Sequence, residues 1–274
     1  MASLGLVELV PPDRFGLTAV GQCLLTGTGS LRDYAFWVTA PALVRPLEQL
    51  AEVVAAGQPA AQQALGQDLW TYLRAHPDEH GHFEGAMTGL STMIAPLVAA
   101  HLDVSSYQQI VDVGGGHGVL LRVLLGHAPQ SRGVLFDLPE VIAGAEASMA
   151  DAAKPGIPIQ TVAGSFLDQV PADGDLYILS HVLTDWDDVL AVKILRNCHR
   201  AGQPGHALAL LELLLPDQPG ETLPFLFDLV LLAATSGQVR TVDAHRRILA
   251  EAGYQLEQVS ALAGGEHILL ARAH

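Results

Sequence analysis

The sequence has few cysteines, few basic residues and no long hydrophobic run. Its cysteines are Cys23 and Cys198, too few for a disulfide framework, so we expect a reducing, cytoplasmic setting. The 29 acidic residues outnumber the 14 basic ones, which gives a net charge of −15. That balance argues against a nucleic acid or an anionic membrane as partner, because either needs a basic surface. The longest apolar stretches, such as 208–215, are too short to cross a bilayer, and the N-terminus lacks the pattern of a signal peptide.

Apolar residues, by contrast, are abundant and regularly spaced. Half of the 274 residues are hydrophobic and 16% are charged, so the chain can bury a large core. From residue 109 onward, short apolar runs alternate with helical patterns, which indicates a parallel sheet covered on both faces. In the tail, 254–262 and 267–273 flank a glycine turn and predict an antiparallel hairpin at the sheet edge. The predicted strands are 109–113, 133–137, 158–162, 175–179 and 206–213, and the helices between them are 118–126, 140–150 and 187–200.

The first hundred residues follow a different pattern. Residues 7–17 predict a small hairpin, and Thr18 is placed to cap a short helix that follows it. From about Asp33 to Ala100 the apolar residues recur at helical spacing. We therefore predict a helical region over 1–100 and an α/β domain over 101–274.

A glycine loop is the most informative motif. The run 111–118 predicts a buried strand that breaks into the triple glycine 114–116 before a helix. Glycine lets backbone N–H groups approach a ligand that a Cβ would keep away. Asp137 ends the next apolar run, where a carboxylate can accept hydrogen bonds from ribose hydroxyls. Together they predict an adenosine-containing cofactor, and the G-x-G-x-G spacing without a second βαβ half argues against a dinucleotide.

Seven segments give the chain a specific resemblance. They are VDVGGGHG (111–118), FDLPEVI (136–142), GSF (164–166), DWDD (185–188), ILRNC (194–198), GQVRT (237–241) and ILAEAGY (248–254). In this order they resemble the S-adenosylmethionine-dependent O-methyltransferases, of the plant caffeate type and the bacterial hydroxyindole type that modify small aromatic metabolites. The resemblance implies a class I methyltransferase fold, a Rossmann-like seven-stranded sheet that is mostly parallel with one antiparallel strand. It also implies that 1–100 is a partial winged-helix and helical region that caps the pocket and supports a homodimer, and that 101–274 binds S-adenosylmethionine or S-adenosylhomocysteine.

The resemblance further implies which residues contact the cofactor. Gly114 and Gly116 would lie beside its amino-acid portion, and Asp137 would accept hydrogen bonds from its ribose hydroxyls. Ser165 stands where the family usually has an aspartate, so a neutral hydroxyl replaces a charge there. The other implied contacts, at the adenine and nearby, are Leu138, Phe166, Ser180 and Trp186.

The chain departs from the family at the catalytic base. The histidine that precedes the Asp-Trp pair in the family is Thr184 here, and the glutamate that helps to hold it is Val239. A second flanking acid survives as Glu212. A threonine hydroxyl has no useful basicity near neutral pH, and general-base catalysis typically contributes roughly 10²–10⁴-fold. Because positioning alone lowers a barrier by roughly 7–11 kcal/mol, we expect catalysis to depend mainly on proximity and orientation.

The candidate catalytic residues are Thr184, His181 and Glu212. His181 precedes Thr184 by about one helical turn, so it is either a relocated base or a polar residue packed in the cavity wall. Glu212 is either a base whose pKa is raised by burial or a structural acid bonded to the backbone.

The resemblance also implies a substrate pocket. Phe83 and Met87, one helical turn apart, would line it, and Asp228, Leu231 and Thr235 would form the facing wall. Such side chains favour a flat, largely apolar substrate. The histidines at 76–82 show no metal-binding spacing, and we interpret them as a polar loop with no metal.

Three functions follow from these features. The leading one is methyl transfer to a small aromatic or polyketide-like metabolite, as in secondary-metabolite and antibiotic biosynthesis. The alternative is a non-methylating reaction on the same fold, a cyclisation, rearrangement or decarboxylation, since the base is lost. A third is a non-catalytic partner subunit, which the two lost positions favour and the intact glycine loop opposes.

Overall fold

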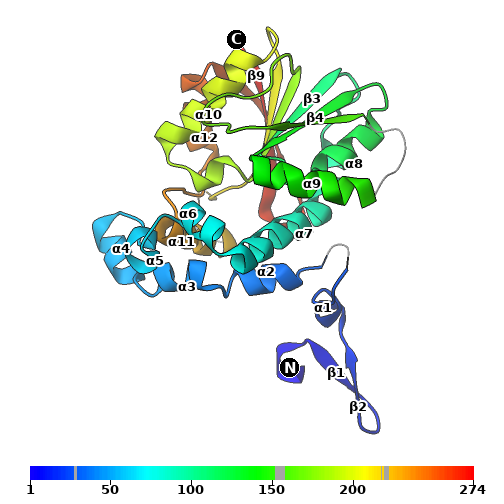
Figure 1. Cartoon of the computed structure of the whole chain (residues 1–274), viewed down its shortest axis with the longest axis vertical. Coiled ribbons are helices and arrows are strands. Elements are labelled where there is room, and N and C mark those ends of the chain that lie inside the picture. The colour runs from blue at the N-terminus through cyan, green and yellow to red at the C-terminus, as the bar shows by residue number, and fades with distance from the viewer. Residues whose placement is uncertain (28–29, 152–157, 217, 219–221) are drawn as a thin grey trace.

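The computed structural model describes residues 1–27, 30–151, 158–216, 218 and 222–274, with a seven-stranded sheet at the centre (Figure 1). The strands are β3 (Gln109–Val113), β4 (Arg132–Asp137), β5 (Ile159–Ala163), β6 (Leu176–Ser180), β7 (Ala207–Leu213), β8 (Tyr254–Ala261) and β9 (Glu266–Ala273). Their order is β5-β4-β3-β6-β7-β9-β8, and β9 runs antiparallel to both of its neighbours. The mostly parallel sheet with one antiparallel strand confirms the predicted fold class.

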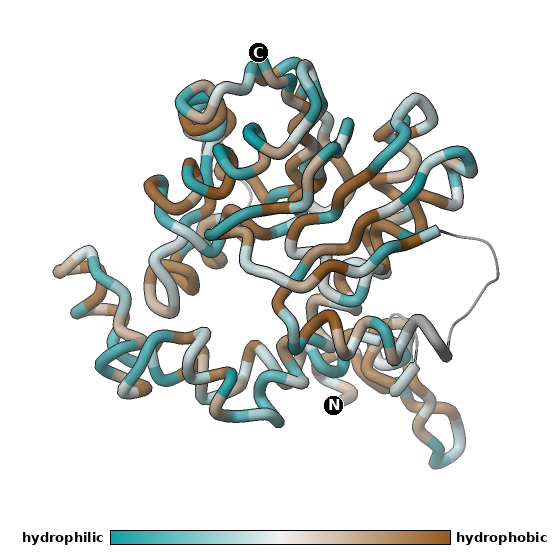
Figure 2. Tube along the Cα trace, turned by 45° about the horizontal axis from the view of Figure 1, so that its top comes forward, coloured by the Kyte–Doolittle hydropathy of each residue, from teal (hydrophilic) through white to brown (hydrophobic). Residues whose placement is uncertain are grey.

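Helices cover both faces of this sheet. They are α7 (Pro77–His101), α8 (Val119–His127), α9 (Pro139–Asp151), α10 (Asp188–Ala201) and α12 (Val242–Glu251). Along β3, Val111 and Val113 join the core formed with α10 and α12, whereas Ile110 joins the core formed with α7 and α8. All three are fully buried, as expected for a strand covered on both faces. Hydrophobic segments accordingly follow the strands through the centre of the molecule (Figure 2).

A second group of helices packs at one end of the sheet (Figure 1). They are α2 (Arg32–Trp37), α3 (Pro41–Leu47), α4 (Leu50–Ala56), α5 (Ala61–Leu65), α6 (Leu69–Ala75) and α11 (Leu223–Ala234). The stretch predicted to be helical over 33–100 is divided, because Gly57 and Gly66 end α4 and α5 with φ values of 64° and 78°. Glu79 ties α7 to this group, accepting hydrogen bonds from the Ala42 N–H and the Tyr72 hydroxyl, each at 2.9 Å.

Among the described residues, α7 is a helix long and apolar enough to cross a membrane by length and composition, with a mean hydropathy of 1.2 over its most apolar window. It packs against α2 and α8, and Ala86, Ala95 and Val98 are fully buried in the protein. About 22% of that window is buried in the protein, and its buried residues face the core formed with α2 and α8.

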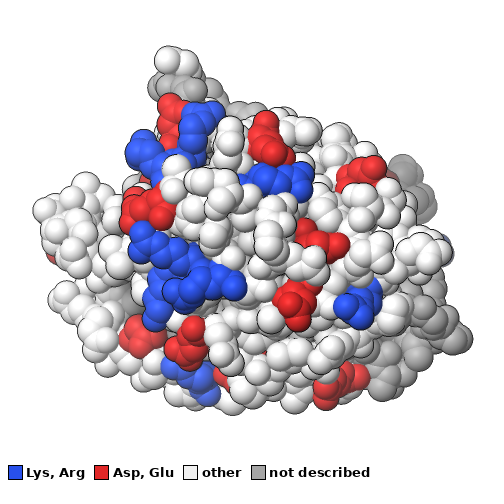
Figure 3. All heavy atoms as spheres, turned by 90° about the horizontal axis from the view of Figure 1, so that it is seen from above, with Lys and Arg blue, Asp and Glu red and all other residues white. Residues whose placement is uncertain are grey.

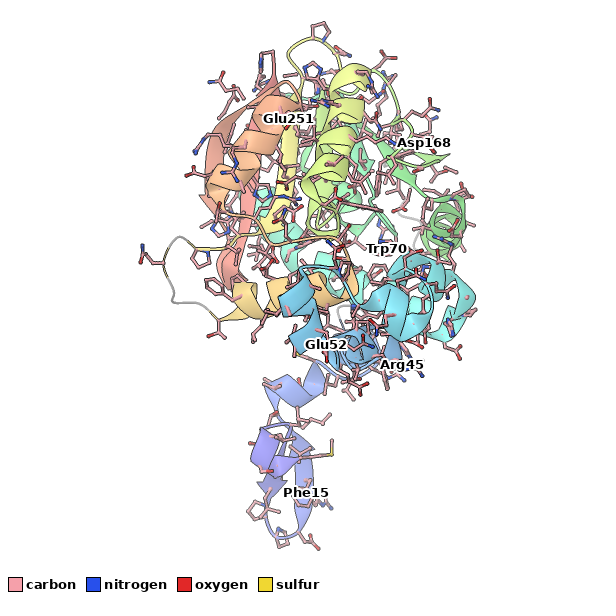
Figure 4. All side chains as sticks on the ribbon, turned by 90° about the vertical axis from the view of Figure 1, so that its left-hand side faces the viewer. Phe15, Arg45, Glu52, Trp70, Asp168 and Glu251 are labelled. Carbon is pink, nitrogen blue, oxygen red and sulfur yellow. The ribbon has the colours of Figure 1, made fainter. Side chains whose placement is uncertain are left out.

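The N-terminal arm, residues 1–27, projects from the body (Figure 1). It contains η1 (Ala2–Leu4), β1 (Val7–Val10), β2 (Arg14–Leu17) and α1 (Ala19–Gln22). The predicted hairpin is present, with β1 antiparallel to β2. Thr18 caps α1 as predicted, because its hydroxyl accepts a hydrogen bond from the Gly21 N–H at 3.1 Å. Phe15 lies toward the far end of the arm (Figure 4) and is 67% exposed.

Charged side chains are intermixed on the face drawn in Figure 3, where basic residues are flanked by acidic ones. Exposed ion pairs such as Arg196–Glu251, at 3.2 Å, are screened by solvent and contribute about 0–1 kcal/mol each. The stability of the fold therefore comes mainly from the cores on the two faces of the sheet.

Candidate active site

A cavity of about 530 Å³ lies where the carboxyl edge of the sheet meets α6 and α7. Open α/β sheets bind ligands in the crevice at this edge. The loops that follow β3, β4, β5 and β6 form one side of the cavity, and Trp70 of α6 stands on the other (Figure 4). All eight residues predicted to contact the cofactor line it: Gly114, Gly116, Asp137, Leu138, Ser165, Phe166, Ser180 and Trp186.

The glycine loop is shaped by main-chain constraints. Gly114 and Gly116 have φ values of 71° and 56°, which glycine adopts without strain. A Cβ on Gly115 would lie 2.6 Å from the Asp112 side chain, and one on Gly114 would lie 2.9 Å from Val182. A Cβ on Gly116 would meet no atom within 4 Å. The loop therefore leaves open space beside its backbone, as a ligand cradle requires.

Asp137 links this loop to the next strand. Its Oδ2 accepts a hydrogen bond from the Gly116 N–H at 2.8 Å, and its Oδ1 accepts one from the Leu138 N–H at 2.7 Å. Burial raises the pKa of Asp137, although these two N–H groups oppose the shift. The carboxylate is thus fixed at the tip of β4, and each oxygen has a further lone pair for a ligand donor.

Asp112 is a site residue to which the sequence analysis assigned no role. It is 1% exposed, it lines the cavity, and neither carboxylate oxygen has a hydrogen-bond partner in the described part of the chain. Burial, followed by the charge of Asp137, raises its pKa to about 7, and the Leu121 N–H, which is near the carboxylate but does not meet hydrogen-bond geometry, opposes this only in part. An unpartnered buried carboxylate is costly, so this position fits a ligand that brings a donor or a positive charge. The signal was in the motif itself, because Asp112 stands just before the glycines.

Aromatic side chains gather on one wall of the cavity. Trp186 meets Phe166 edge-on, with ring centroids 5.9 Å apart, and stacks with Trp70 at 6.2 Å and 24°. Trp70 comes from α6 and was not anticipated from the sequence. Ser165 fixes the backbone beside Phe166, since its hydroxyl accepts a hydrogen bond from the Leu167 N–H at 3.2 Å. The wall offers flat apolar surface to a ring-shaped ligand.

Thr184 and Glu212 lie outside the lining of this cavity in the described structure. Thr184 is 5% exposed, and its hydroxyl is 3.4 Å from the Gln238 carbonyl oxygen. Glu212 is also buried, and its Oε1 accepts a hydrogen bond from the Leu183 N–H at 3.1 Å. Burial raises the pKa of Glu212 to about 8. Glu212 therefore holds the turn that carries Thr184, and the catalytic roles of both remain predictions.

His181 does line the cavity. It follows β6 with a φ of 55°, a left-handed conformation that residues other than glycine rarely adopt. Its Nε2 lies 3.0 Å from an oxygen of Glu266, and its Nδ1 lies 3.2 Å from the Ser180 hydroxyl. Burial lowers the pKa of His181, but the hydrogen bond and charge of Glu266, followed by the charges of Glu212 and Asp185, raise it overall. Glu266, at the start of β9, was not anticipated from the sequence.

The predicted substrate wall is divided between two places. The residues that line the cavity are Phe83 and Met87, and those outside its described lining are Asp228, Leu231 and Thr235. Asp228 accepts a hydrogen bond from the Val239 N–H at 2.8 Å. The Thr235 hydroxyl accepts one from the Gly237 N–H at 2.9 Å. The α11 side chains thus support the segment that follows the helix, and their contact with substrate remains a prediction.

Arg240 holds the turn before α10 from the side away from the cavity lining. It is 2% exposed, and its Nη1 and Nη2 donate hydrogen bonds to the carbonyls of Leu183 and Trp186 at 2.8 and 2.7 Å. Its Nε donates to the Asp188 carboxylate at 2.9 Å. Because this turn carries Asp185 and Trp186 to the cavity wall, the guanidinium fixes the wall although Arg240 is not part of its described lining.

The R240A substitution should destabilise the fold. It leaves the Trp186 carbonyl without its donor and removes one of two donors from the Leu183 carbonyl and from the Asp188 carboxylate. We therefore expect the free energy of unfolding to fall by about 2–4 kcal/mol. Urea denaturation followed by circular dichroism measures this change. The matched control is R246A, which removes an exposed arginine paired with Asp243 and should change the value by less than about 0.5 kcal/mol. Equal losses in the two variants would contradict the structural role of Arg240.

The histidine-rich segment is not the predicted loop, because His80 and His82 lie in the first turns of α7 and His76 is at its N-cap. Its side chains make local contacts. His76 Nδ1 lies 2.7 Å from the Tyr72 carbonyl oxygen, and His82 Nδ1 lies 3.0 Å from the Asp33 carboxylate. Within the described residues, no group of three or more histidine, cysteine or acidic side chains is arranged to hold a metal ion.

Comparisons with known proteins agree with this geometry. Residues 47–255 match the family model of the O-methyltransferase domain. The chain is 36% identical over 274 residues to a phenazine O-methyltransferase of Lysobacter antibioticus, which covers 99% of this chain and 80% of that protein. It is 36% identical over 273 residues to a 3-amino-4-hydroxybenzoate 4-O-methyltransferase of Streptomyces cremeus, covering 99% of this chain and 74% of that protein.

A solved structure with bound ligands is also similar. It is the O-methyltransferase NcsB1 from neocarzinostatin biosynthesis, in complex with S-adenosylmethionine and 2-hydroxy-5-methyl naphthoic acid. The TM-score is 0.80 at 28% identity, and the match covers 100% of this chain and 82% of that one. The family model spans most of the chain, and both relatives match it almost from end to end. The chain therefore belongs to the S-adenosylmethionine-dependent O-methyltransferases that modify small molecules.

Proposed function

We propose that this enzyme transfers a methyl group from S-adenosylmethionine to a small, flat aromatic or polyketide-like metabolite in natural-product biosynthesis. One observation carries the proposal: the cavity joins the glycine cradle and Asp137 to the apolar side chains of Phe83 and Met87. A donor and a flat acceptor can therefore lie side by side in one enclosure. The relatives named for phenazine, hydroxybenzoate and naphthoic acid support an aromatic acceptor.

The residues of the cradle fit an adenosyl sulfonium with an amino-acid tail. The backbone at Gly116 and the unpartnered carboxylate of Asp112 would hold the amino-acid end, with Asp112 facing its ammonium group. Asp137 would accept hydrogen bonds from the ribose hydroxyls, and Phe166 and Trp186 would pack beside the adenine. When bound, the cofactor supplies an electrophilic methyl group.

Orientation is the main source of rate acceleration in this proposal. Thr184, at the position of the family base, is buried against Gln238. Val239, at the position of the supporting acid, is 2% exposed and packs with Leu213 and Leu231. General-base catalysis is worth roughly 10²–10⁴-fold, whereas correct positioning lowers a barrier by roughly 7–11 kcal/mol. An acceptor that ionises easily, such as an acidic hydroxyaromatic, is then the best substrate.

The D137A substitution should weaken cofactor binding. It removes the acceptor of the ribose hydroxyls and the lock on the Gly116 N–H. A hydrogen bond to a charged group is worth about 1.5–3 kcal/mol, so S-adenosylhomocysteine should bind roughly 10–100-fold more weakly. Isothermal titration calorimetry provides the test. D103N, which alters an exposed acid bonded to the Ser105 N–H, should bind like the wild type, and an unaffected D137A would show the ribose assignment to be wrong.

Methyl transfer itself is tested with methyl-labelled S-adenosylmethionine and a panel of phenols, aromatic amines and enols. We expect label in an acidic hydroxyaromatic product, detected by mass as the gain of one methyl group. T184A should retain the wild-type kcat, because the Thr184 hydroxyl lies outside the cavity lining. A large loss of kcat in T184A would contradict the view that this position no longer takes part.

Two other results would favour the competing functions. Conversion of an acceptor without gain of a methyl group would favour a cyclisation, rearrangement or decarboxylation on the same fold. Failure to bind both S-adenosylmethionine and S-adenosylhomocysteine would favour a non-catalytic partner subunit.

We also propose that two copies associate through the N-terminal arm, in the cytoplasm. Leu9, Phe15 and Val20 are 59%, 67% and 61% exposed, and monomeric proteins rarely expose contiguous apolar surface of this kind. Cys23 and Cys198 are free thiols, which fits a reducing compartment.

The F15D substitution should shift the assembly toward the monomer. A carboxylate at the interface would have to be desolvated without a partner, which opposes association. Sedimentation velocity at micromolar concentration should show a wild-type dimer and a smaller species for F15D. V189D, on the exposed start of α10 and 78% exposed in the wild type, should leave the dimer intact. A monomeric wild type would overturn the proposal.

A further inference from the structure

One pair of side chains at the cavity has the geometry of a base and its orienting acid. His181 Nε2 and Glu266 Oε2 are 3.0 Å apart, and their side chains are 21% and 20% exposed. The other ring nitrogen, Nδ1, is 3.2 Å from the Ser180 hydroxyl, and both Ser180 and His181 line the cavity. In this arrangement a carboxylate holds one ring nitrogen, and the other ring nitrogen faces a hydroxyl from which it can accept a proton. General-base catalysis requires such an arrangement.

The sheet topology creates this pair. Ser180 pairs with Leu211 across β6 and β7, and Leu213 pairs with Glu266 across β7 and β9. Because β9 is antiparallel, its first residue stands at the edge where the parallel strands end. His181 is fixed there by its own N–H, which donates to the Leu211 carbonyl at 2.9 Å. Its left-handed φ of 55° is strained for a residue other than glycine, and such strain is typical of functional positions.

We propose that His181 is the general base of methyl transfer, with Glu266 as its positioning residue. This assignment rests on the proposed methyltransferase function and names the residue that takes over from position 184. The Nε2–H group donates to Glu266 and fixes the neutral tautomer whose Nδ1 carries the lone pair. The acceptor hydroxyl replaces the Ser180 hydroxyl at Nδ1.

Proton transfer to His181 accompanies methyl transfer to the acceptor oxygen. The acceptor O–H bond breaks and an N–H bond forms at Nδ1 of His181. The oxygen electron pair forms the bond to the methyl carbon while the carbon–sulfur bond of the donor breaks, and that electron pair stays on sulfur as a neutral thioether. The imidazolium is stabilised by the Glu266 carboxylate until it releases its proton to solvent.

Two other acids face His181, and the geometry favours neither as the base. Glu212 of β7 lies outside the described cavity lining and is bonded to the Leu183 N–H. Asp185, in the turn after β6, lines the cavity, and burial raises its pKa to about 7. No hydrogen bond among the described residues orients the Asp185 carboxylate, whereas His181 is held at both ring nitrogens.

The first test is His181→Asn. Asparagine tolerates a left-handed backbone and has no basicity, so the fold and the affinity for S-adenosylhomocysteine should be unchanged. The kcat for the best acceptor should fall roughly 10²-fold or more, and the acidic limb of the pH–rate profile should disappear. H127Q, which changes an exposed histidine at the end of α8, is the matched control and should behave like the wild type.

The second test separates positioning from mere structure. In E266Q the amide oxygen still accepts from Nε2–H, but the negative charge is gone. The pKa of His181 should then fall, because Glu266 contributes the leading effects that raise it. The acidic limb of kcat and the His181 titration followed by NMR should both move to lower pH. E257Q, which changes an exposed acid paired with Arg272 at 3.4 Å, should move neither.

The outcomes distinguish this assignment from the function on which it rests. If H181N turned over as fast as the wild type, the assignment of His181 as the base would be wrong, while the methyltransferase function would stand. Loss of the acidic limb of the pH–rate profile in D185N but not in H181N would have the same consequence. If the His181 titration did not move in E266Q, Glu266 would not be the positioning residue. A wild type that binds S-adenosylhomocysteine yet methylates no acceptor would overturn the methyltransferase proposal, and the assignment would fall with it.

Discussion

The constraint on which the site depends is that the carboxyl ends of parallel strands meet at one edge of the sheet. β3 lies between β4 and β6, so the glycine loop, Asp137 and His181 arrive side by side from distant parts of the chain. The bond from the Gly116 N–H to Asp137 then locks the first two of these strands together. The antiparallel β9 adds Glu266 to the same edge, because this strand starts where its neighbours end.

The parts of the fold that the sequence predicts are those governed by local rules. A strand covered on both faces must be apolar throughout, so 109–113 and 206–213 were recognisable as strands. The triple glycine and Asp137 were recognisable because a turn with positive φ next to a ligand allows few other residues. The eight predicted cofactor residues share one cavity for that reason, since all of them lie at a strand end or in the loop that follows one. The position of Thr18 at a helix start is likewise a local property.

The parts that escaped prediction depend on contacts between distant residues. Glu266 meets His181 across 85 residues of sequence, and nothing in either local pattern indicates that β9 inserts beside β7. The stacking of Trp70 with Trp186 also escaped prediction, because it depends on how α6 packs against the α/β domain. The side chains of α11 are assigned to substrate from the resemblance alone, and this stays a prediction because a one-dimensional motif does not specify which face of a helix points to the cavity.

Two pairs of positions bear on the proposed base: 184 with 239, and 181 with 266. Thr184 and Val239 are both buried, and Val239 packs with Leu213 and Leu231. A glutamate at 239 would have to enter this apolar cluster, and without an imidazolium beside it the desolvation cost would have no compensation. His181 instead lines the cavity, and Glu266 is its partner at 3.0 Å. In our proposal, the base at 181 is held by the acid at 266, which leaves no role for a histidine at 184 or for an acid at 239.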